Sequence, residues 1–313
     1  MRFFDGHCDT VLRCYTEKTS LREDPGGHWD LKRAGEFSES AQFFALFGDA
    51  GSTPGKPFPR VFQEEHEVFC RELNRNRDKI TLCRTKEEAE LAFALGKTAA
   101  FLSVEGAELI ECSISGLEEA WSMGVRAVNL TWNRANVLSG SVAEEPERGL
   151  SAKGREFVQR MQCLGMLVDV SHLSDPGFWD VIELAEKPVF ASHSNARAVW
   201  PHRRNLTDQQ FEALARNGGV AGLNLYANFL GEDPDFDTII DHLDHFWSLG
   251  GENHVSLGGD WDGCDLLPRG FERGISGLNE FYEYLLRKNY SEMLIEKLYF
   301  KNLMRVVGEV CTT

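Results

Sequence analysis

The sequence predicts an α/β protein folded as a single (β/α)8 TIM barrel. Eight short apolar runs rich in β-forming residues alternate with longer amphipathic stretches, which is the element count of that barrel. The competing fold, an open doubly wound sheet, usually carries a glycine-rich phosphate loop after its first strand, and none follows Arg2–Cys8. The sequence contains no internal repeat and no linker, so we expect one domain over residues 1–313.

The expected strands are short and apolar, as parallel strands covered on both faces are. In chain order they are Arg2–Cys8, Gln42–Phe47, Thr98–Val104, Val125–Thr131, Met166–Ser171, Pro188–Ser192, Gly219–Leu225 and Val255–Gly259.

Helices are expected between and after these strands, where apolar residues recur at helical spacing. They cover Pro59–Leu73, Lys86–Ala94, Gly116–Met123, Gly154–Leu164, Asp175–Ala185, Thr207–Asn217, Thr238–Leu249, Gly277–Lys288 and Ser291–Val307. Ser291 is the kind of residue that begins a helix. The stretches Asp49–Pro59 and Ser139–Ser151 are expected as long loops, the first of them over the barrel mouth.

The charge of the chain argues against nucleic acids and anionic membranes as binding partners. Lys and Arg number 33 against 49 Asp and Glu, so the net charge is −16. Nucleic acids and anionic membranes both bind clustered basic residues, so neither is expected as a partner. No apolar run is as long as the about 18 residues needed to cross a bilayer, and no signal peptide is visible. The eight cysteines form no CxxC pair. We therefore expect a cytoplasmic protein with reduced thiols.

A metal-binding pattern stands at the end of the first expected strand. His7 and Asp9 flank Cys8. Alternate residues of a strand point to opposite faces, so His7 and Asp9 share one face while Cys8 faces the helical layer. Taken alone the pattern is common, and its plainer interpretation is a structural histidine beside a turn carboxylate.

Four further strands end in a side chain of the same kind. These side chains are Glu105, His172, His193 and Asp260. Active sites of (β/α)8 barrels are built at this end of the strands, so the side chains are expected to converge. Imidazole and carboxylate together suit zinc or a related divalent ion.

The number of candidate ligands predicts two metal ions. Five ligands exceed what one open catalytic zinc takes, whereas two ions that share a carboxylate account for all of them. In this scheme one ion is held by His7 and Asp9, the other by His172 and His193, and Glu105 bridges them. A water between two cations would be acidified, and Asp260 remains to take its proton and pass it to the leaving group.

Seven stretches, in their order and spacing, form a more specific signal. They are Asp5-Gly6-His7-Cys8-Asp9-Thr10, Val104-Glu105-Gly106-Ala107, Gly149-Leu150-Ser151, Val168-Asp169-Val170-Ser171-His172, Ala191-Ser192-His193-Ser194, Arg203-Arg204-Asn205 and Gly258-Gly259-Asp260-Trp261-Asp262-Gly263. With these stretches the sequence resembles a bacterial-type member of the membrane (renal) dipeptidase family, peptidase M19, over nearly its whole length.

The resemblance implies a barrel of the metallo-dependent hydrolase type that holds two zinc ions and hydrolyses dipeptides. It implies the same roles for the five ligands and Asp260, and it suggests a homodimer. It also implies that Arg204 binds the carboxylate of the dipeptide, which a guanidinium can bond with two parallel hydrogen bonds. The residues alone favour the interpretation that Arg204 is a surface cation beside Arg203.

One position departs from the family. The better-known animal members place a histidine after Leu-Thr at the end of the fourth strand, where it contacts the substrate's reacting centre, and here Trp132 follows Thr131. Indole donates one hydrogen bond and cannot carry a proton, so oxyanion stabilisation is expected from a metal or from Asn133. Trp132 is then a wall of the substrate site or part of the core, and Tyr226 is a candidate to line the site.

These observations predict a zinc-dependent dipeptidase that attacks with a metal-bridging hydroxide. Another dinuclear hydrolase, acting on a lactone, a cyclic amide or an N-acyl amino acid, is the alternative, although Val125–Thr131 lacks the bridging lysine of the standard amidohydrolase pattern. A catalytically silent metal- or peptide-binding homologue is a second alternative, which Trp132 favours. His242 and His245 lie at helical spacing among charged residues and are expected on a solvated face.

Overall fold

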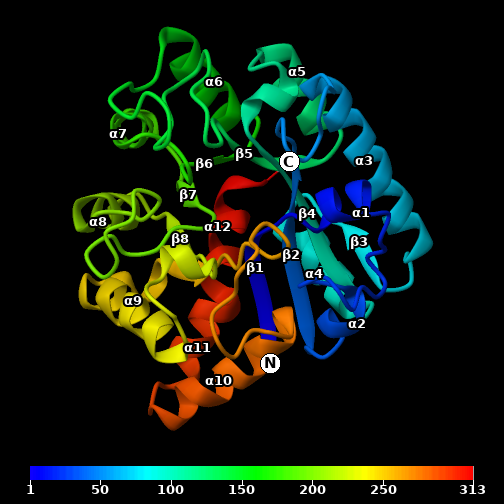
Figure 1. Cartoon of the computed structure of the whole chain (residues 1–313), viewed down its shortest axis with the longest axis vertical. Coiled ribbons are helices and arrows are strands. Elements are labelled where there is room, and N and C mark those ends of the chain that lie inside the picture. The colour runs from blue at the N-terminus through cyan, green and yellow to red at the C-terminus, as the bar shows by residue number, and fades with distance from the viewer. Residues whose placement is uncertain (313) are drawn as a thin grey trace.

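The computed structural model describes residues 1–312, in which parallel strands close into a barrel surrounded by helices (Figure 1). The strands are β1 (Arg2–Cys8), β2 (Glu39–Phe47), β3 (Ile80–Leu82), β4 (Thr98–Glu105), β5 (Val125–Asn129), β6 (Leu167–Asp169), β7 (Phe190–Ala191), β8 (Val220–Leu223) and β9 (Val255–Leu257). Each expected strand is present, and the order β1, β2, β4, β5, β6, β7, β8, β9 closes because β1 pairs with both β2 and β9. The predicted (β/α)8 barrel is confirmed.

The strand β3 lies outside the closed ring. It pairs with the first residues of β4, whereas β5 pairs with the later residues of β4 on the same edge. The sequence interpretation missed β3 because its three residues are too short to show a period.

The helices cover the outside of the barrel. They are α1 (Thr10–Thr16), α2 (Leu31–Ala34), α3 (Phe58–Arg75), α4 (Lys86–Ala94), α5 (Ile114–Ser122), α6 (Ala152–Cys163), α7 (Asp175–Leu184), α8 (Asp208–Arg216), α9 (Phe236–Ser248), α10 (Gly277–Arg287), α11 (Glu292–Glu296) and α12 (Asn302–Val310). Ser and Thr side chains begin several of them; the Ser291 hydroxyl accepts a hydrogen bond from the Leu294 amide, as expected for the last helical segment. The short helices α1 and α2 were not predicted.

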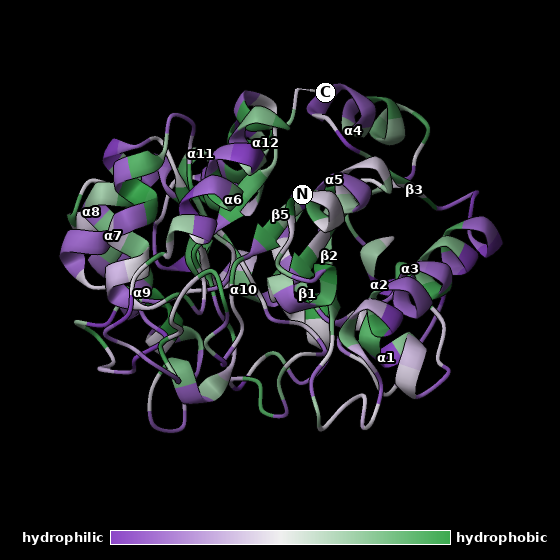
Figure 2. Ribbon diagram, turned by 90° about the horizontal axis from the view of Figure 1, so that it is seen from above, coloured by the Kyte–Doolittle hydropathy of each residue, from purple (hydrophilic) through white to green (hydrophobic). Residues whose placement is uncertain are grey.

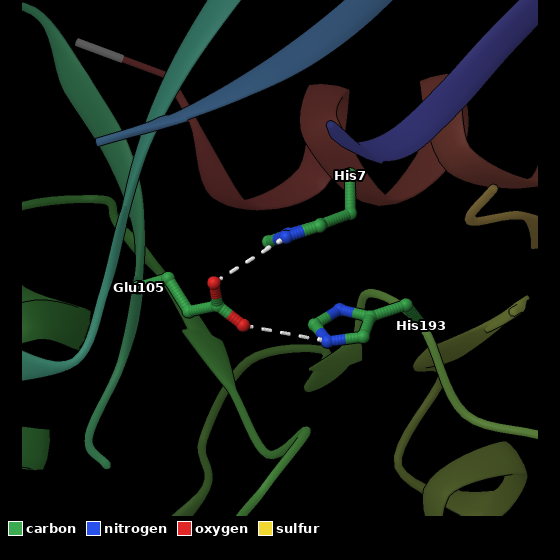
Figure 3. A group of neighbouring side chains, drawn as sticks. All are labelled: His7, Glu105 and His193. Atoms are coloured by element: carbon green, nitrogen blue, oxygen red, sulfur yellow. Dashed lines mark ion pairs between the residues drawn. The ribbon is translucent and has the colours of Figure 1, made fainter. Parts of the chain in front are cut away.

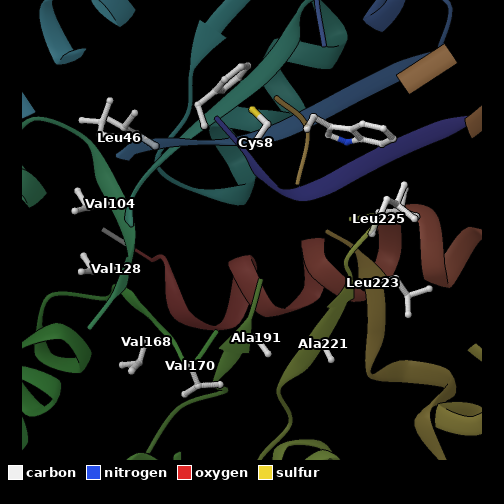
Figure 4. Packing of buried hydrophobic residues seen from close by; sticks show 14 of the residues in the cluster. Cys8, Leu46, Val104, Val128, Val168, Val170, Ala191, Ala221, Leu223 and Leu225 are labelled. Atoms are coloured by element: carbon white, nitrogen blue, oxygen red, sulfur yellow. The ribbon is translucent and has the colours of Figure 1, made fainter. Parts of the chain in front are cut away.

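Two apolar layers hold the barrel together. Outward-facing residues of the strands, Cys8 and Leu46 among them, belong to one buried apolar cluster with residues of the helices. Figure 4 shows some of these side chains around the barrel. Inside, Phe4 stacks on Phe43 with ring centroids 5.6 Å apart, and this cluster continues into α12, which closes the amino end of the barrel. Figure 2 shows apolar strands in the middle and hydrophilic residues on the outer faces of the helices. Because the amino end of the barrel interior is apolar, its polar side chains gather at the carboxyl end of the strands.

Within residues 1–312, no helix has both the length and the apolar character needed to traverse a bilayer. All eight cysteines are free thiols.

Candidate metal centre

Six side chains converge at the carboxyl end of the barrel, and all six are buried. They come from β1, from the end of β4 and from the turns that follow β1, β6, β7 and β9, and they are His7, Asp9, Glu105, His172, His193 and Asp260. The predicted convergence of the strand ends is therefore present.

Glu105 faces three imidazoles, and Figure 3 shows one of its carboxylate oxygens toward His7 and the other toward His193. Its Oε1 is 3.0 Å from His172 Nε2 and 3.5 Å from His193 Nε2. Its Oε2 is 3.6 Å from His7 Nε2. The two carboxylate oxygens thus face different imidazoles, which is the arrangement that a bridging ligand needs.

Two more carboxylates approach His7 from the other side. Asp9 Oδ2 lies 3.3 Å and Asp260 Oδ1 lies 4.0 Å from His7 Nε2. Asp9 is the N-cap residue of α1, but its side chain caps no backbone amide and turns toward the site. Gly263 leaves room for both carboxylates, since a Cβ there would lie 2.1 Å from Asp9 Oδ2 and 2.4 Å from Asp260 Oδ1.

The donor atoms of the site fit divalent cations. Ligand atoms of His7, Glu105 and His193 lie within 4.8 Å of one another, and so do those of His7, Asp9 and Asp260. Among residues 1–312, His7 Nε2 and Asp9 Oδ1 are buried without a hydrogen-bond partner. A buried polar atom left without a partner costs about 1–3 kcal/mol, and a bound cation would remove that cost.

Burial shapes the charge of the site. It raises the pKa of Glu105 to about 7, and although His7 opposes this shift, Asp9 adds to it. Burial also holds the pKa values of His172 and His193 well below the ordinary value. These two imidazoles are therefore neutral, which is the form that binds a metal, and the crowded carboxylates favour a cation between them.

Outer hydrogen bonds orient the imidazoles. Asn133 Oδ1 lies 3.0 Å from His172 Nδ1, and Ser192 Oγ lies 2.6 Å from His193 Nδ1. Because an amide oxygen only accepts, His172 Nδ1 carries the proton and Nε2 presents its lone pair to the site. Asn133 was predicted as a substrate contact, and its amide oxygen lies against His172 Nδ1, the ring nitrogen that faces away from Glu105.

Two site residues sit in strained backbone conformations. His172 has φ 68° and Asp260 has φ 57°, in the left-handed region that disfavours residues with a Cβ. Such strain persists where the surrounding structure fixes it and clusters at functional sites.

The sequence interpretation missed a buried aspartate, Asp5, whose hydrogen bonds hold the backbone beside the site. Asp5 accepts hydrogen bonds from the backbone amides of His7 (3.0 Å) and Gly259 (2.8 Å) and from Trp261 Nε1 (3.1 Å). It thereby joins the end of β1 to the turn that carries Asp260. The available signal was a carboxylate in the middle of the apolar run Arg2–Cys8.

Arg204 is buried beside the metal centre, so its interpretation as a surface cation is wrong, whereas its neighbour Arg203 is exposed. Its Nη2 donates to the His193 carbonyl at 3.2 Å, and within the described residues its Nε has no partner. Burial lowers the pKa of Arg204 to about 10, while Asp260 and Glu105 counteract that shift. The guanidinium stays charged at neutral pH.

The aromatic candidates lie at different distances from the centre. The Trp132 ring is half-buried, 4.9 Å from the Phe47 ring and 6.2 Å from the His172 ring, measured between centroids. Tyr226 packs on Phe229 at 4.8 Å, and Phe229 in turn lies 5.5 Å from the Arg204 guanidinium. Trp132 therefore borders a candidate ligand, whereas Tyr226 is linked to Arg204 through Phe229.

The expectation of a solvated face for His242 is wrong. This residue is fully buried, accepts a hydrogen bond from the Ala196 amide at 3.1 Å and has Nε2 2.9 Å from the Leu230 carbonyl. Charged neighbours in sequence concealed this role, because both partners come from other segments. His245 is half-buried and pairs with Asp208 at 2.7 Å.

Comparison with known proteins assigns the chain to a family. Residues 1–313 match the family described as membrane dipeptidase, peptidase family M19. A Klebsiella pneumoniae relative, described as an uncharacterized protein in the pqqA 5′ region, is 32% identical over 83% of this chain and 99% of its own length.

Solved structures agree in fold over the whole chain. A metallopeptidase from Rhodobacter sphaeroides, liganded with a phosphinate mimic of the dipeptide L-Ala-D-Ala, is 29% identical with a TM-score of 0.90, covering 99% of both chains. Dipeptidase AC, a metallopeptidase of family M19, is 30% identical with a TM-score of 0.91, covering 100% of this chain and 99% of its own. The chain belongs to the membrane dipeptidase family, peptidase family M19, and is a metal-dependent hydrolase of peptide bonds.

Proposed function

We propose that this protein is a zinc dipeptidase with two metal ions, which hydrolyses the one peptide bond of free dipeptides. The observation that carries the proposal is the position of Glu105, with one carboxylate oxygen toward His7 and the other toward His172 and His193. His7 and Asp9 would hold one ion, His172 and His193 the other, and Glu105 would bridge. When bound, such ions supply Lewis acidity that polarises a carbonyl and acidifies a water molecule.

Asp260 is the proposed proton carrier. Its Oδ1 faces His7 Nε2 at 4.0 Å, on the side of the candidate ligands, so it would lie near a water that attacks from the metal site. A carboxylate in this position can take that proton and give it to the departing nitrogen.

Arg204 is the proposed partner of the substrate carboxylate. It is buried and charged, and within residues 1–312 its Nε has no hydrogen-bond partner. The dipeptide mimic held by the Rhodobacter sphaeroides enzyme supports a substrate of this size. Trp132 cannot carry a proton, so we assign it to the wall of the substrate site near His172.

A turnover assay with and without metal tests the proposal. Protein stripped with a chelator and reloaded with zinc would be given a dipeptide, its tripeptide homologue, an N-acyl amino acid and a lactone. We expect dipeptide hydrolysis only after reloading, together with two bound ions per chain. Faster cleavage of the N-acyl amino acid or the lactone would instead favour the alternative hydrolase, and metal binding without turnover would indicate a silent homologue.

A further inference from the structure

A buried asparagine that follows β8 holds the proposed proton carrier. Asn224 is fully buried, and its Nδ2 donates to Asp260 Oδ2 at 3.0 Å. The same Nδ2 lies 3.4 Å from the His193 carbonyl, and Oδ1 accepts a hydrogen bond from the Tyr226 amide at 2.6 Å. Each polar atom of the side chain is therefore engaged, which fixes the direction of the amide.

Its backbone is fixed as firmly as its side chain. Asn195 Oδ1 accepts from the Asn224 amide and Asn195 Nδ2 donates to the Asn224 carbonyl, both at 2.9 Å. The neighbouring backbones are in close contact, since a Cβ on Gly222 would lie 2.0 Å, and one on Gly258 1.9 Å, from the Ser192 carbonyl oxygen. Asn224 and Asp260 thus lie just beyond the ends of β8 and β9, two paired strands whose backbones are closely packed.

The chemistry of an amide N–H distinguishes the two oxygens of Asp260. The amide group donates and cannot take a proton from a carboxylic acid, so Oδ2 is held as an acceptor. Oδ1 makes the approach of 4.0 Å to His7 Nε2. The oxygen that faces the candidate metal ligands is thus the one left to exchange a proton.

We propose that Asn224 is a positioning residue for hydrolysis, which holds Asp260 so that Oδ1 carries the proton; this inference rests on the proposed dipeptidase function. As the water oxygen bonds to the carbonyl carbon, the π pair of the C=O bond moves to the carbonyl oxygen and one water proton passes to Oδ1. When the C=O bond re-forms and the C–N bond breaks, the nitrogen takes the electron pair of the C–N bond and this proton and leaves as an amine. Asp260 returns to its carboxylate form.

The test compares two leaving groups on metal-loaded protein. In Asn224→Leu and in the smaller variant Asn224→Ala, we expect kcat for a dipeptide to fall at least about 10-fold, part of the about 10²–10⁴-fold that acid–base catalysis contributes. KM and bound metal should change little. A thiodepsipeptide analogue leaves as a thiolate, whose conjugate thiol has a pKa of about 8.5, so it needs Asp260 to take the water proton but not to protonate the leaving group, and its kcat should fall less than that of the dipeptide. In an Asp260→Asn background the Asn224 substitutions should add no further loss.

Asn302→Leu is the matched control. Asn302 is another buried asparagine whose Nδ2 donates two hydrogen bonds to carbonyls, those of Glu252 (3.0 Å) and Val255 (2.8 Å), at the opposite end of β9. We expect this variant to lose stability and keep its kcat.

An unchanged kcat on the dipeptide would overturn the positioning role, and equal losses on both substrates would overturn the transfer of the proton to the leaving nitrogen. In both cases wild-type dipeptide turnover still supports the proposed function. Absence of dipeptide turnover in the metal-loaded wild type would overturn both.

Discussion

Substitution of Arg204 tests how the enzyme would distinguish a dipeptide from a longer peptide. The side chain is 5% exposed, and Asp260 and Glu105 are the carboxylates that most favour its charge. A substrate carboxylate would add an anionic partner next to the scissile bond. A tripeptide or a C-terminal amide would place an uncharged amide at that point and leave the buried charge less well paired.

The expected size of the effect follows from this environment. Removing one partner of a buried, hydrogen-bonded charge pair costs about 2–5 kcal/mol. The two protein carboxylates already compensate part of the guanidinium charge, so we expect the lower part of that range, about 2–3 kcal/mol. At about 1.4 kcal/mol for each factor of ten, this is a preference of about 30- to 150-fold in kcat/KM for the free dipeptide over its amide.

The assay measures kcat/KM for one dipeptide and its C-terminal amide on four proteins. We expect Arg204→Ala to remove most of the preference by slowing the free dipeptide, and Arg204→Lys to restore part of it, because an ammonium lacks the planar fork. Arg203→Ala is the control, since that neighbour is exposed. Metal content is measured in parallel because Arg204 also bonds the His193 carbonyl. The same preference in all four proteins would refute the role of Arg204.

Two further predictions concern the metal centre and the stability of the fold. Glu105→Gln should weaken both metal sites together, because it removes a charge that both would share; elemental analysis showing loss of a single ion would contradict a bridge. Burial lowers the pKa of His242 to about 4 from the ordinary 6.5, so the unfolded chain binds a proton there before the folded one does, and stability is lost as the pH falls from 6.5 toward 4. Between pH 7 and pH 5 the free energy of unfolding, measured with urea, should fall by about 2 kcal/mol more in the wild type than in His242→Gln. An equal fall in both proteins would show that His242 does not titrate in this way.

The candidate metal ligands could be predicted because their signal is local. Alternation along β1 separates His7 and Asp9 from Cys8, and Cys8 is indeed in the outer apolar layer. In a barrel the carboxyl ends of the strands meet, so a side chain at the end of a strand needs no further information to be placed near the others. Glu105, the last residue of β4, is the clearest case.

The supporting residues could not be predicted, because their partners come from distant segments. The carboxylate of Asp5 accepts a hydrogen bond from the turn after β9, and the side-chain amide of Asn224 donates one to Asp260 in that same turn. Neither contact leaves a periodic trace in sequence. His242 was misplaced for the same reason, since Ala196 and Leu230 surround it only in the folded chain.

The sequence by itself determined the barrel and the identity of the candidate ligands, because both depend on the period of the strands and on what stands at their ends. Only the tertiary structure decided which atoms face one another: that Glu105 presents separate oxygens to separate imidazoles, and that Arg204 is buried while Arg203 is not. The physical reason is that side-chain direction and burial are fixed by packing between adjacent strands and loops, which adjacent positions in the sequence do not encode.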